Sequence, residues 1–173
     1  MIMIDPTKIT INDLPLVVFS AHSTDLFSWL IRWRTKGSYN HAMLMFRPGY
    51  VATQGWTYKE VPIEAYMKKN SKLKFWSIKD VKPEELDILF TRVSKRLKLP
   101  WWKRRYDPLG IVGQAVGLPY INAPWADFCS ESVAGDLRAA FRIILPKRPS
   151  PQFLNEEFKV VDRVEYFGHW LSD

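Results

Sequence analysis

The sequence predicts a single α+β domain, in which strands and helices alternate without a regular strand–helix–strand rhythm. Short apolar runs bounded by Pro, Gly and charged residues are typical of strands, and one longer segment repeats apolar residues at helical spacing. The chain has 173 residues, of which 47% are hydrophobic, and this is enough for one domain to bury a core. Its aromatic content of 14%, with eight Trp, predicts a core built largely from rings.

The first half of the chain is predicted to be mainly β-structure. An apolar run at 14–20 is typical of a buried strand, and Ser-Thr-Asp at 23–25 offers helix-start chemistry just after it. Two strand-like segments flank the turn signal Arg-Pro-Gly at 47–49, which predicts a β-hairpin. The expected elements are, in order, a strand at 14–20, a helix at 26–33, strands at 41–46 and 50–56, one or two helical turns at 63–69, and a strand at 73–78.

The clearest helix is predicted over residues 83–97. Pro83 suits its first turn, two glutamates follow at the positive end of the helix dipole, and apolar residues recur at helical spacing to the end. Pro100 then stops the helix. A last helix is expected at 129–141, followed by a proline-rich turn into a mixed C-terminal tail.

The chain is strongly basic, because 25 Lys and Arg residues outnumber 18 Asp and Glu and give a net charge of +7. Such a surface attracts nucleic acid, an anionic membrane or an acidic cell-wall polymer, and charge alone does not choose among them. No nucleic-acid recognition motif occurs, which argues against that partner. No secretory signal opens the chain, and the uncharged stretch at 108–126 is interrupted by Gly and Pro, unlike a membrane span. We expect a cytoplasmic location by default, or association with a virion or delivery to the cell envelope.

Few residues are available for catalysis. The sequence contains no P-loop, no GxSxG, no HExxH and no Cys/His zinc spacing. Its histidines are His22, His41 and His169 and its one cysteine is Cys129, so we expect no multi-histidine metal site, no cofactor and no internal disulfide. We expect His22, in a loop, and His169, in an aromatic terminal segment, to be surface or packing residues.

Cys129 lies at the predicted start of the last helix. Backbone N–H groups and the positive end of the helix dipole would point at its sulfur there, and both lower the pKa of a thiol. The same N–H groups could hold an oxyanion. The alternative is a buried cysteine that serves as a small apolar residue.

His41 begins the first strand of the predicted hairpin, on the face shared with the methionines at 43 and 45. The expected turn pairs Arg47 with Tyr50 and Met43 with Gln54, so Gln54 would lie diagonal to His41 on that face. A histidine beside a polar group that fixes its ring is the base-and-orienter arrangement of a nucleophilic triad. A one-residue slip in register would move Gln54 to the other face. The alternative is a structural histidine whose hydrogen bonds are satisfied on a half-buried face of the sheet.

A basic run that contains two tryptophans follows the clearest helix. Lys103, Arg104 and Arg105 could contact an anionic surface, and Trp101 and Trp102 could dock on lipid, glycan or single-stranded nucleic acid. The alternative is a solvated helix exit with one Trp in the core.

Five segments together resemble a known family: the apolar strand at 14–20, the helix leading to Ser38-Tyr39-Asn40-His41-Ala42-Met43-Leu44, the hairpin partner Tyr50-Val51-Ala52-Thr53-Gln54, Tyr106-Asp107, and Phe128-Cys129-Ser130-Glu131-Ser132. The chain resembles the circularly permuted branch of the NlpC-like papain-fold hydrolases, the YiiX/YaeF-like group related to lecithin–retinol acyltransferase. In that branch the His-bearing strand precedes the Cys-bearing helix, and His41 does precede Cys129. The resemblance covers about residues 14–141, with 142–173 as a C-terminal extension. It implies one permuted papain-like domain over 1–173, in which a central antiparallel sheet packs against helices.

By this resemblance Cys129 is the nucleophile and His41 its general base. The third, orienting position, often Glu in this branch, falls at Gln54, and Tyr106 is expected to line the pocket or to assist the oxyanion. The implied activity is that of a cysteine hydrolase, an amidase or thiol protease that forms a thioester at Cys129.

Family substrates include cell-wall peptides and lipid esters or amides, so peptidoglycan peptides are a candidate substrate and acyl transfer or lipase action stays open. Related domains also occur in phage proteins. The alternative function is a catalytically silent papain-like component, such as a virion or assembly protein.

Overall fold

One antiparallel sheet organises the chain in the computed structural model, which describes residues 2–21, 37–55, 57–104, 129–147 and 149–172. Its strands lie in the order β4-β3-β2-β1-β5-β6, and within these residues three helices accompany them. This is the α+β architecture that the sequence predicts. The strands are β1 (Leu16–Ala21), β2 (His41–Arg47), β3 (Tyr50–Gln54), β4 (Tyr58–Pro62), β5 (Lys72–Ile78) and β6 (Val164–Leu171). The helices are α2 (Pro83–Leu97), α4 (Cys129–Phe141) and α5 (Pro151–Glu157), and the 3-10 turns are η1 (Pro6–Lys8), η2 (Ile11–Asp13), η3 (Ile63–Tyr66) and η4 (Trp101–Lys103).

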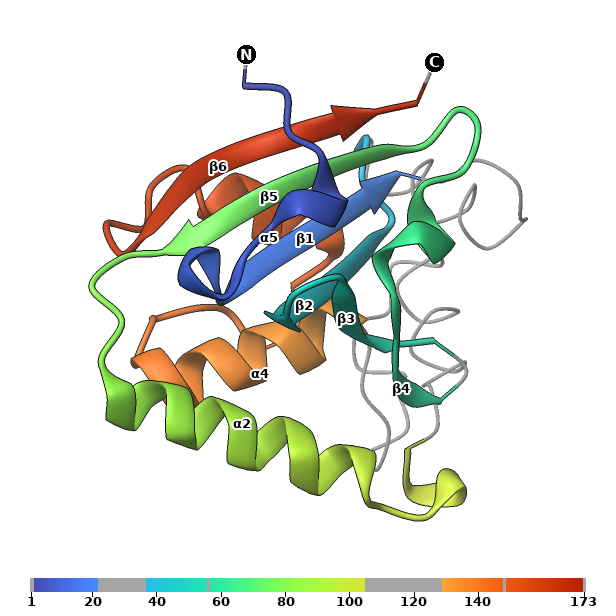
Figure 1. Cartoon of the computed structure of the whole chain (residues 1–173). Coiled ribbons are helices and arrows are strands. Elements are labelled where there is room, and N and C mark those ends of the chain that lie inside the picture. Colours follow the sequence, from blue (N-terminus) through green and yellow to red (C-terminus); the bar gives the residue numbers. More distant parts are fainter. Residues whose placement is uncertain (1, 22–36, 56, 105–128, 148, 173) are drawn as a thin grey trace.

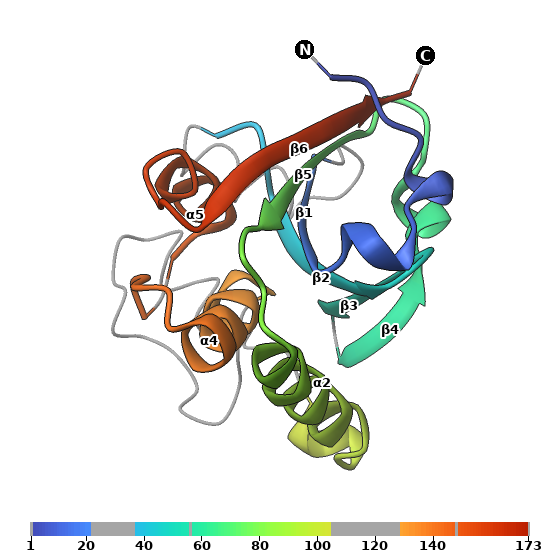
Figure 2. The same cartoon turned by 60° about the vertical axis from the view of Figure 1, so that its left-hand side comes forward.

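The helices cover one face of the sheet (Figure 1). The main core lies between them, where Phe19 and Leu44 of the central strands are buried with Leu89 of α2 and Leu137 of α4. Figure 2 shows α2 and α4 side by side against that face, with α5 beside the β5–β6 edge. The bounds of α2 and α4 agree with the helices that the sequence predicts at 83–97 and 129–141.

Among the described residues, 3-10 turns cover the other face of the sheet. Ile9, which follows η1, and Ile63 of η3 are buried there with Met43 and Met45 of β2. The residues that alternate with these methionines belong to the helix-side core. The face assignment of β2 is therefore confirmed, and His41, two residues before Met43, starts the strand on the face of the 3-10 turns.

The β2–β3 hairpin contains a β-bulge that changes the predicted register. Its turn lies where expected, with Gly49 at a φ of 74° and Arg47 paired with Tyr50. Between Leu44 and Arg47 the register shifts by one residue, so that Met43 pairs with Thr53. The predicted pairing of Met43 with Gln54 is therefore wrong, because an extra residue in β2 moves every later partner by one.

Three elements lie where the sequence pattern predicted loops or a mixed tail. β4 extends the hairpin into a third strand by pairing with β3, and α5 begins after Ser150, whose hydroxyl accepts a hydrogen bond from the backbone N–H of Phe153. β6 pairs with β5, so the segment 142–173 completes the sheet that the rest of the chain begins. The helix expected at 26–33 lies outside the described residues.

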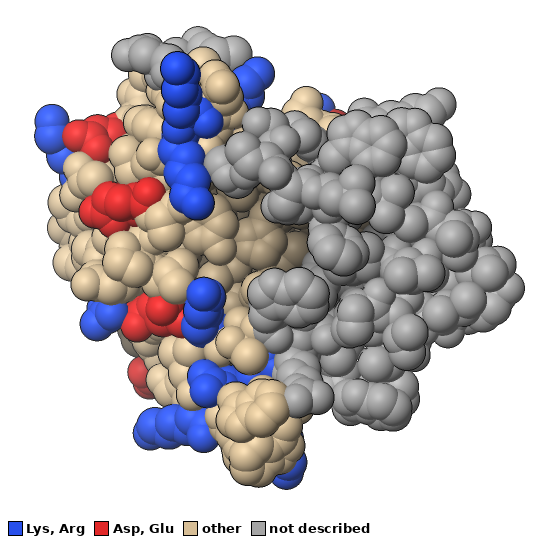
Figure 3. Space-filling view, turned by 90° about the vertical axis from the view of Figure 1, so that its right-hand side faces the viewer, with Lys and Arg blue, Asp and Glu red and all other residues tan. Residues whose placement is uncertain are grey.

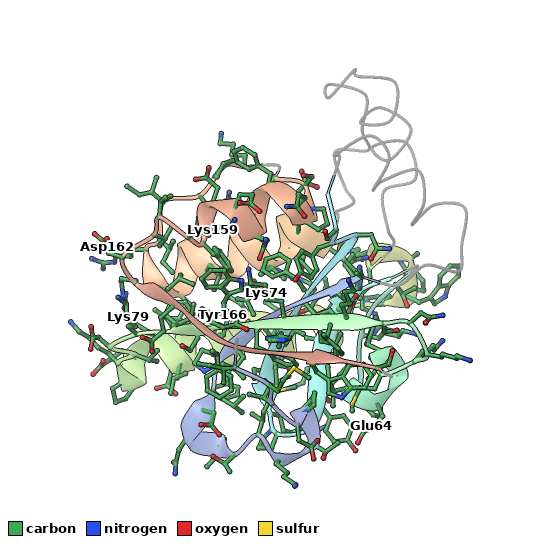
Figure 4. All side chains as sticks on the ribbon, turned by 90° about the horizontal axis from the view of Figure 1, so that it is seen from above. Glu64, Lys74, Lys79, Lys159, Asp162 and Tyr166 are labelled. Carbon is green, nitrogen blue, oxygen red and sulfur yellow. The ribbon has the colours of Figure 1, made fainter. Side chains whose placement is uncertain are left out.

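A cluster of aromatic and polar side chains packs β6 against β5. Lys74 and Tyr166 lie close together on the two strands (Figure 4), and the Lys74 ammonium is 4.6 Å from the ring centroid of Trp76. The Tyr166 hydroxyl and His169 Nδ1 are hydrogen bonded at 2.5 Å, and His169 is only 7% exposed. His169 is therefore a packing residue, which is one of the two roles expected for it. None of the described helices combines the length and the apolar character needed to cross a membrane.

Candidate active site

Cys129 is the first residue of α4 and is buried, with only 2% of its surface exposed. α4 packs across β2, and the backbone N–H groups of Ala42 and Ser130 lie close enough to the Cys129 sulfur to favour its thiolate. Ala42 directly follows His41 in β2, so the fold brings the predicted nucleophile to within one residue of the predicted base along that strand. The two residues are 88 positions apart in the sequence, and the packing of α4 on the sheet joins them.

The pKa of the Cys129 thiol is raised to about 11. Burial is the largest cause, because the thiolate loses its hydration, and the backbone hydrogen bonds to the sulfur oppose it only in part. The sequence predicts the opposite direction, from the helix N-terminus alone. That prediction is wrong in the described structure: the N–H groups do point at the sulfur, but desolvation outweighs them. The thiol is therefore protonated at neutral pH.

His41 is half-buried and is held by two hydroxyl groups. Its Nε2 lies 2.5 Å from Thr53 Oγ1 and 3.3 Å from the Tyr66 hydroxyl. The Tyr66 ring stacks on the imidazole at 5.6 Å between centroids with the planes 20° apart, and its hydroxyl donates to Thr53 Oγ1. These contacts fix the imidazole in one orientation.

Tyr66, which belongs to η3, contacts His41 and lies within electrostatic range of Cys129. Burial raises the pKa of its hydroxyl, which therefore stays neutral and can donate hydrogen bonds. His41, Thr53 and Tyr66 thus form one cluster, built from β2, β3 and η3. Cys129, at the start of α4, lies near enough to Tyr66 to contribute to the rise in its pKa.

Gln54 does not take the orienting position predicted for it. Its side-chain amide donates to the backbone carbonyl of Arg104 at 2.8 Å, and Thr53 supplies the hydroxyl at His41 instead. The bulge in β2 is the physical reason, because it puts Thr53 opposite Met43 and so on the face of His41. Gln54 consequently ties the end of β3 to the chain that follows η4.

Two members of the cluster, Thr53 and Tyr66, are missed by the sequence interpretation. Thr53 would have been found by allowing one bulge residue in the hairpin, since it directly precedes Gln54. No sequence pattern around Tyr66 indicates a role beside His41, because η3 comes from a later part of the chain and reaches the histidine only in the folded structure. Ser20 is a further neighbour: it pairs with His41 in the sheet, and its buried hydroxyl has no hydrogen-bond partner among the described residues.

A buried ionic network fixes α4 against α2. Asp136, whose side chain is 1% exposed, accepts hydrogen bonds from Arg96 at 2.8 and 3.2 Å and from Arg92 at 3.2 Å. Arg96 also donates to the hydroxyl of Ser132 and lies over the ring of Tyr58. Burial raises the pKa of Asp136, against the effect of the two guanidinium groups. The network holds the helix whose first residue is Cys129.

The basic run after α2 is divided between the interior and the surface. Lys103 is exposed, whereas Arg104 Nη1 donates to the backbone carbonyls of Tyr58 and Leu97 at 3.2 Å each. Arg104 therefore serves a structural role, not the role of an exposed contact that the sequence suggested. Arg105 and the predicted pocket residue Tyr106 lie outside the described residues.

The described residues contain no group of three or more His, Cys, Asp and Glu placed to hold a metal ion. What they do contain is an imidazole oriented by hydroxyl groups, and a thiol with backbone N–H groups at its sulfur, one of them from the residue that follows the histidine. These are the groups that an acyl-transfer site uses. No protein-family model matches the chain, and no curated protein is significantly similar to it.

Proposed function

We propose that this protein is a cysteine hydrolase with a permuted papain-like fold, in which Cys129 is the nucleophile and His41 the general base. The observation that supports this most strongly is the approach of the Cys129 sulfur to the backbone of Ala42, because Ala42 is the residue that follows His41 in β2. An amide or ester is the substrate class, with cell-wall peptides as the first candidates.

The resting site holds a neutral thiol, so the reaction begins with a proton transfer. Because His41 Nε2 is engaged by Thr53, we assign Nδ1 as the nitrogen that accepts the Cys129 proton. The sulfur then bonds to the substrate carbonyl carbon, and the carbonyl electrons move to oxygen. The N–H groups that now lie at the sulfur are donors suited to that oxyanion.

Collapse of the oxyanion breaks the bond to the leaving group, which takes the proton from His41 Nδ1. A thioester remains on Cys129. Water, deprotonated by the now neutral His41, attacks the thioester and releases the acid and the thiol. Thr53 acts as a positioning residue: its hydroxyl holds the ring, but it stabilises an imidazolium less than a carboxylate would.

The second candidate function is a catalytically silent papain-like component of an assembly. The raised pKa and the 2% exposure of Cys129 favour it, because a silent descendant of a cysteine enzyme keeps a buried, protonated thiol. The two candidates differ in what His41 does: only the enzyme needs its proton transfer.

A panel of chromogenic esters and cell-wall stem peptides, tested with matched variants, distinguishes the two. Cys129→Ala should abolish turnover, and His41→Ala should lower it about 100-fold or more. Thr53→Val should lower it about 2–10-fold, because it removes the hydroxyl that is hydrogen bonded to His41.

Gln54→Met is the matched control, since Gln54 is the neighbouring residue in β3 but contacts Arg104. It should lower the thermal midpoint and leave turnover within about two-fold, as expected for a lost structural hydrogen bond. A larger loss of turnover in Gln54→Met than in Thr53→Val contradicts the assigned site. Turnover that survives Cys129→Ala rules out the cysteine mechanism.

A further inference from the structure

The turn that follows α2 presents two tryptophans to solvent. Trp101 is 55% exposed and Trp102 is 56% exposed, in η4, and their ring centroids are 6.0 Å apart with the planes 84° to each other. The sequence alternative, with one Trp in the core, is not what the structure shows. Two large amphipathic rings exposed together on one short turn are typical of a contact surface.

The surroundings of η4 are basic and contain no acidic side chain along the sequence from 95 to 104. Arg96 and Arg104 are engaged within the fold, whereas Lys95, Lys98 and Lys103 are exposed. Lys95 of α2 and Lys98, the residue that caps the end of α2, are three positions apart and so lie on the same side of the helix end. Lys and Arg side chains gather at the lower edge of the view in Figure 3, which is the level of the yellow turn at the lower right of Figure 1.

Arg104, the residue that directly follows η4, fixes the position of this turn. The Arg104 guanidinium donates to Leu97 of α2 and to Tyr58 of β4, and its own carbonyl accepts from the Tyr58 N–H and from Gln54. The two tryptophans are therefore held on a turn that is anchored to the sheet. A pre-ordered turn loses little conformational entropy when its rings insert into a partner.

We propose that η4 docks this protein on an anionic lipid bilayer, with Trp101 and Trp102 in the interfacial layer and the three exposed lysines over the headgroups. Tryptophan prefers the membrane–water interface, and each lysine near an anionic surface contributes about 1 kcal/mol. Three lysines thus favour anionic over zwitterionic vesicles about 100-fold.

The geometry of the two rings favours a bilayer over a nucleic acid or a glycan. Bases and sugars stack on the flat faces of rings, and two rings at 84° form a wedge instead of a continuous platform. Arg96 and Arg104, the described arginines at 95–104, are engaged inside the fold and so are not free for bidentate contacts to phosphates. Exposed lysines act as point charges, which suits attraction to a fluid headgroup layer.

This docking does not depend on the proposed enzymatic function. The docking turn is linked to β3, because the Arg104 carbonyl is hydrogen bonded to Gln54, the neighbour of Thr53. The docking surface therefore borders the strand that orients His41.

Co-sedimentation of the full chain with vesicles tests the inference. Mixed phosphatidylcholine–phosphatidylglycerol vesicles should bind the protein about 100-fold more tightly than phosphatidylcholine alone, and added salt should weaken the binding. The variant W101A/W102A should lose at least about ten-fold in affinity for the mixed vesicles, and K95Q/K98Q/K103Q should lose the preference for anionic lipid.

Two control variants carry the same chemical changes elsewhere on the surface. The variant K68Q/K69Q/K72Q removes the same charge, and I144A/F153A removes exposed apolar side chains, of which Ile144 is 94% exposed. Both should bind close to the wild-type level, and circular dichroism checks that every variant is folded. The proposal is overturned by wild-type binding of W101A/W102A, by an equal loss in the controls, or by an absence of vesicle binding. It is also overturned if the tryptophans are needed for binding oligo(dT) or peptidoglycan and not vesicles.

Discussion

The salt bridge between Asp136 and Arg96 should be one of the most costly polar contacts to break. The Asp136 side chain is 1% exposed, and Arg96 reaches both of its oxygens, at 2.8 and 3.2 Å. Asp136→Asn keeps the shape of the side chain but removes its charge. The Arg96 guanidinium, whose side chain is 16% exposed, then loses its buried counter-charge.

Breaking a buried pair by removing one partner costs about 3–5 kcal/mol, out of a total stability of about 5–15 kcal/mol for a domain. Arg92 also contacts Asp136, but its side chain is 41% exposed and water screens it. We therefore expect Arg92→Ala to cost about 1 kcal/mol or less. The double variant R96M/D136L should cost less than Asp136→Asn, because it leaves no unpaired charge behind.

Urea unfolding followed by far-UV circular dichroism measures all three variants. The expected order of destabilisation is Asp136→Asn first, then R96M/D136L, then Arg92→Ala. If Asp136→Asn costs less than about 1 kcal/mol, the reasoning that the network holds α4 on α2 is refuted. An equal cost for Arg92→Ala would refute the assignment of the strong contact to Arg96.

Three further outcomes test other parts of the structure. The Arg163 hydrogen bond lowers the pKa of Glu85 from 4.5 to about 2, so the stability it contributes is present above pH 4.5 and lost as the pH falls towards 2. After screening by water, this contribution to the free energy of unfolding is about 1–2 kcal/mol. In Glu85→Gln the stability should therefore depend less on pH between 4.5 and 2, and an unchanged pH dependence there would contradict the assignment. In Gly168→Ala the new Cβ would lie 2.6 Å from Ile4 Cγ2, which should lower stability by about 1–3 kcal/mol in thermal unfolding, whereas an unchanged midpoint would show that the N-terminal segment yields freely. Iodoacetamide should label Cys129 slowly near neutral pH, with a midpoint towards 11 in the folded protein; a midpoint below that of an ordinary thiol would show that burial does not dominate.

Patterns within single elements predicted much of the fold. α2 and α4 begin and end where the sequence places them, and the alternation of β2 is as predicted. Local pattern is enough in these cases, because helical spacing and strand alternation are properties of short segments. β6 and α5 were missed because an edge strand and a short helix are stabilised by partners elsewhere in the chain. The sequence of a proline-rich tail does not show which partners it will have.

The candidate site was predicted in outline and missed in detail. Cys129 and His41 give local signals, a helix start and a strand start, and the fold does bring their neighbourhoods together. The identity of the orienting residue depends on the register of a hairpin. Because of one bulge residue, Thr53 and not Gln54 lies beside His41. The direction of the thiol pKa was also wrong, because sequence shows a helix N-terminus but not how much apolar structure surrounds it.

The most direct test of the account is to trap the acyl group on the cysteine. The protein is mixed with p-nitrophenyl acetate and quenched in acid, and peptide mass spectrometry locates the acetyl group. We predict acetylation of Cys129 in the wild type, at a rate about 100-fold or more lower in His41→Ala and little changed in Gln54→Met. An acetyl group found elsewhere, or equal rates with and without His41, would contradict the claim that Cys129 and His41 act as a catalytic pair.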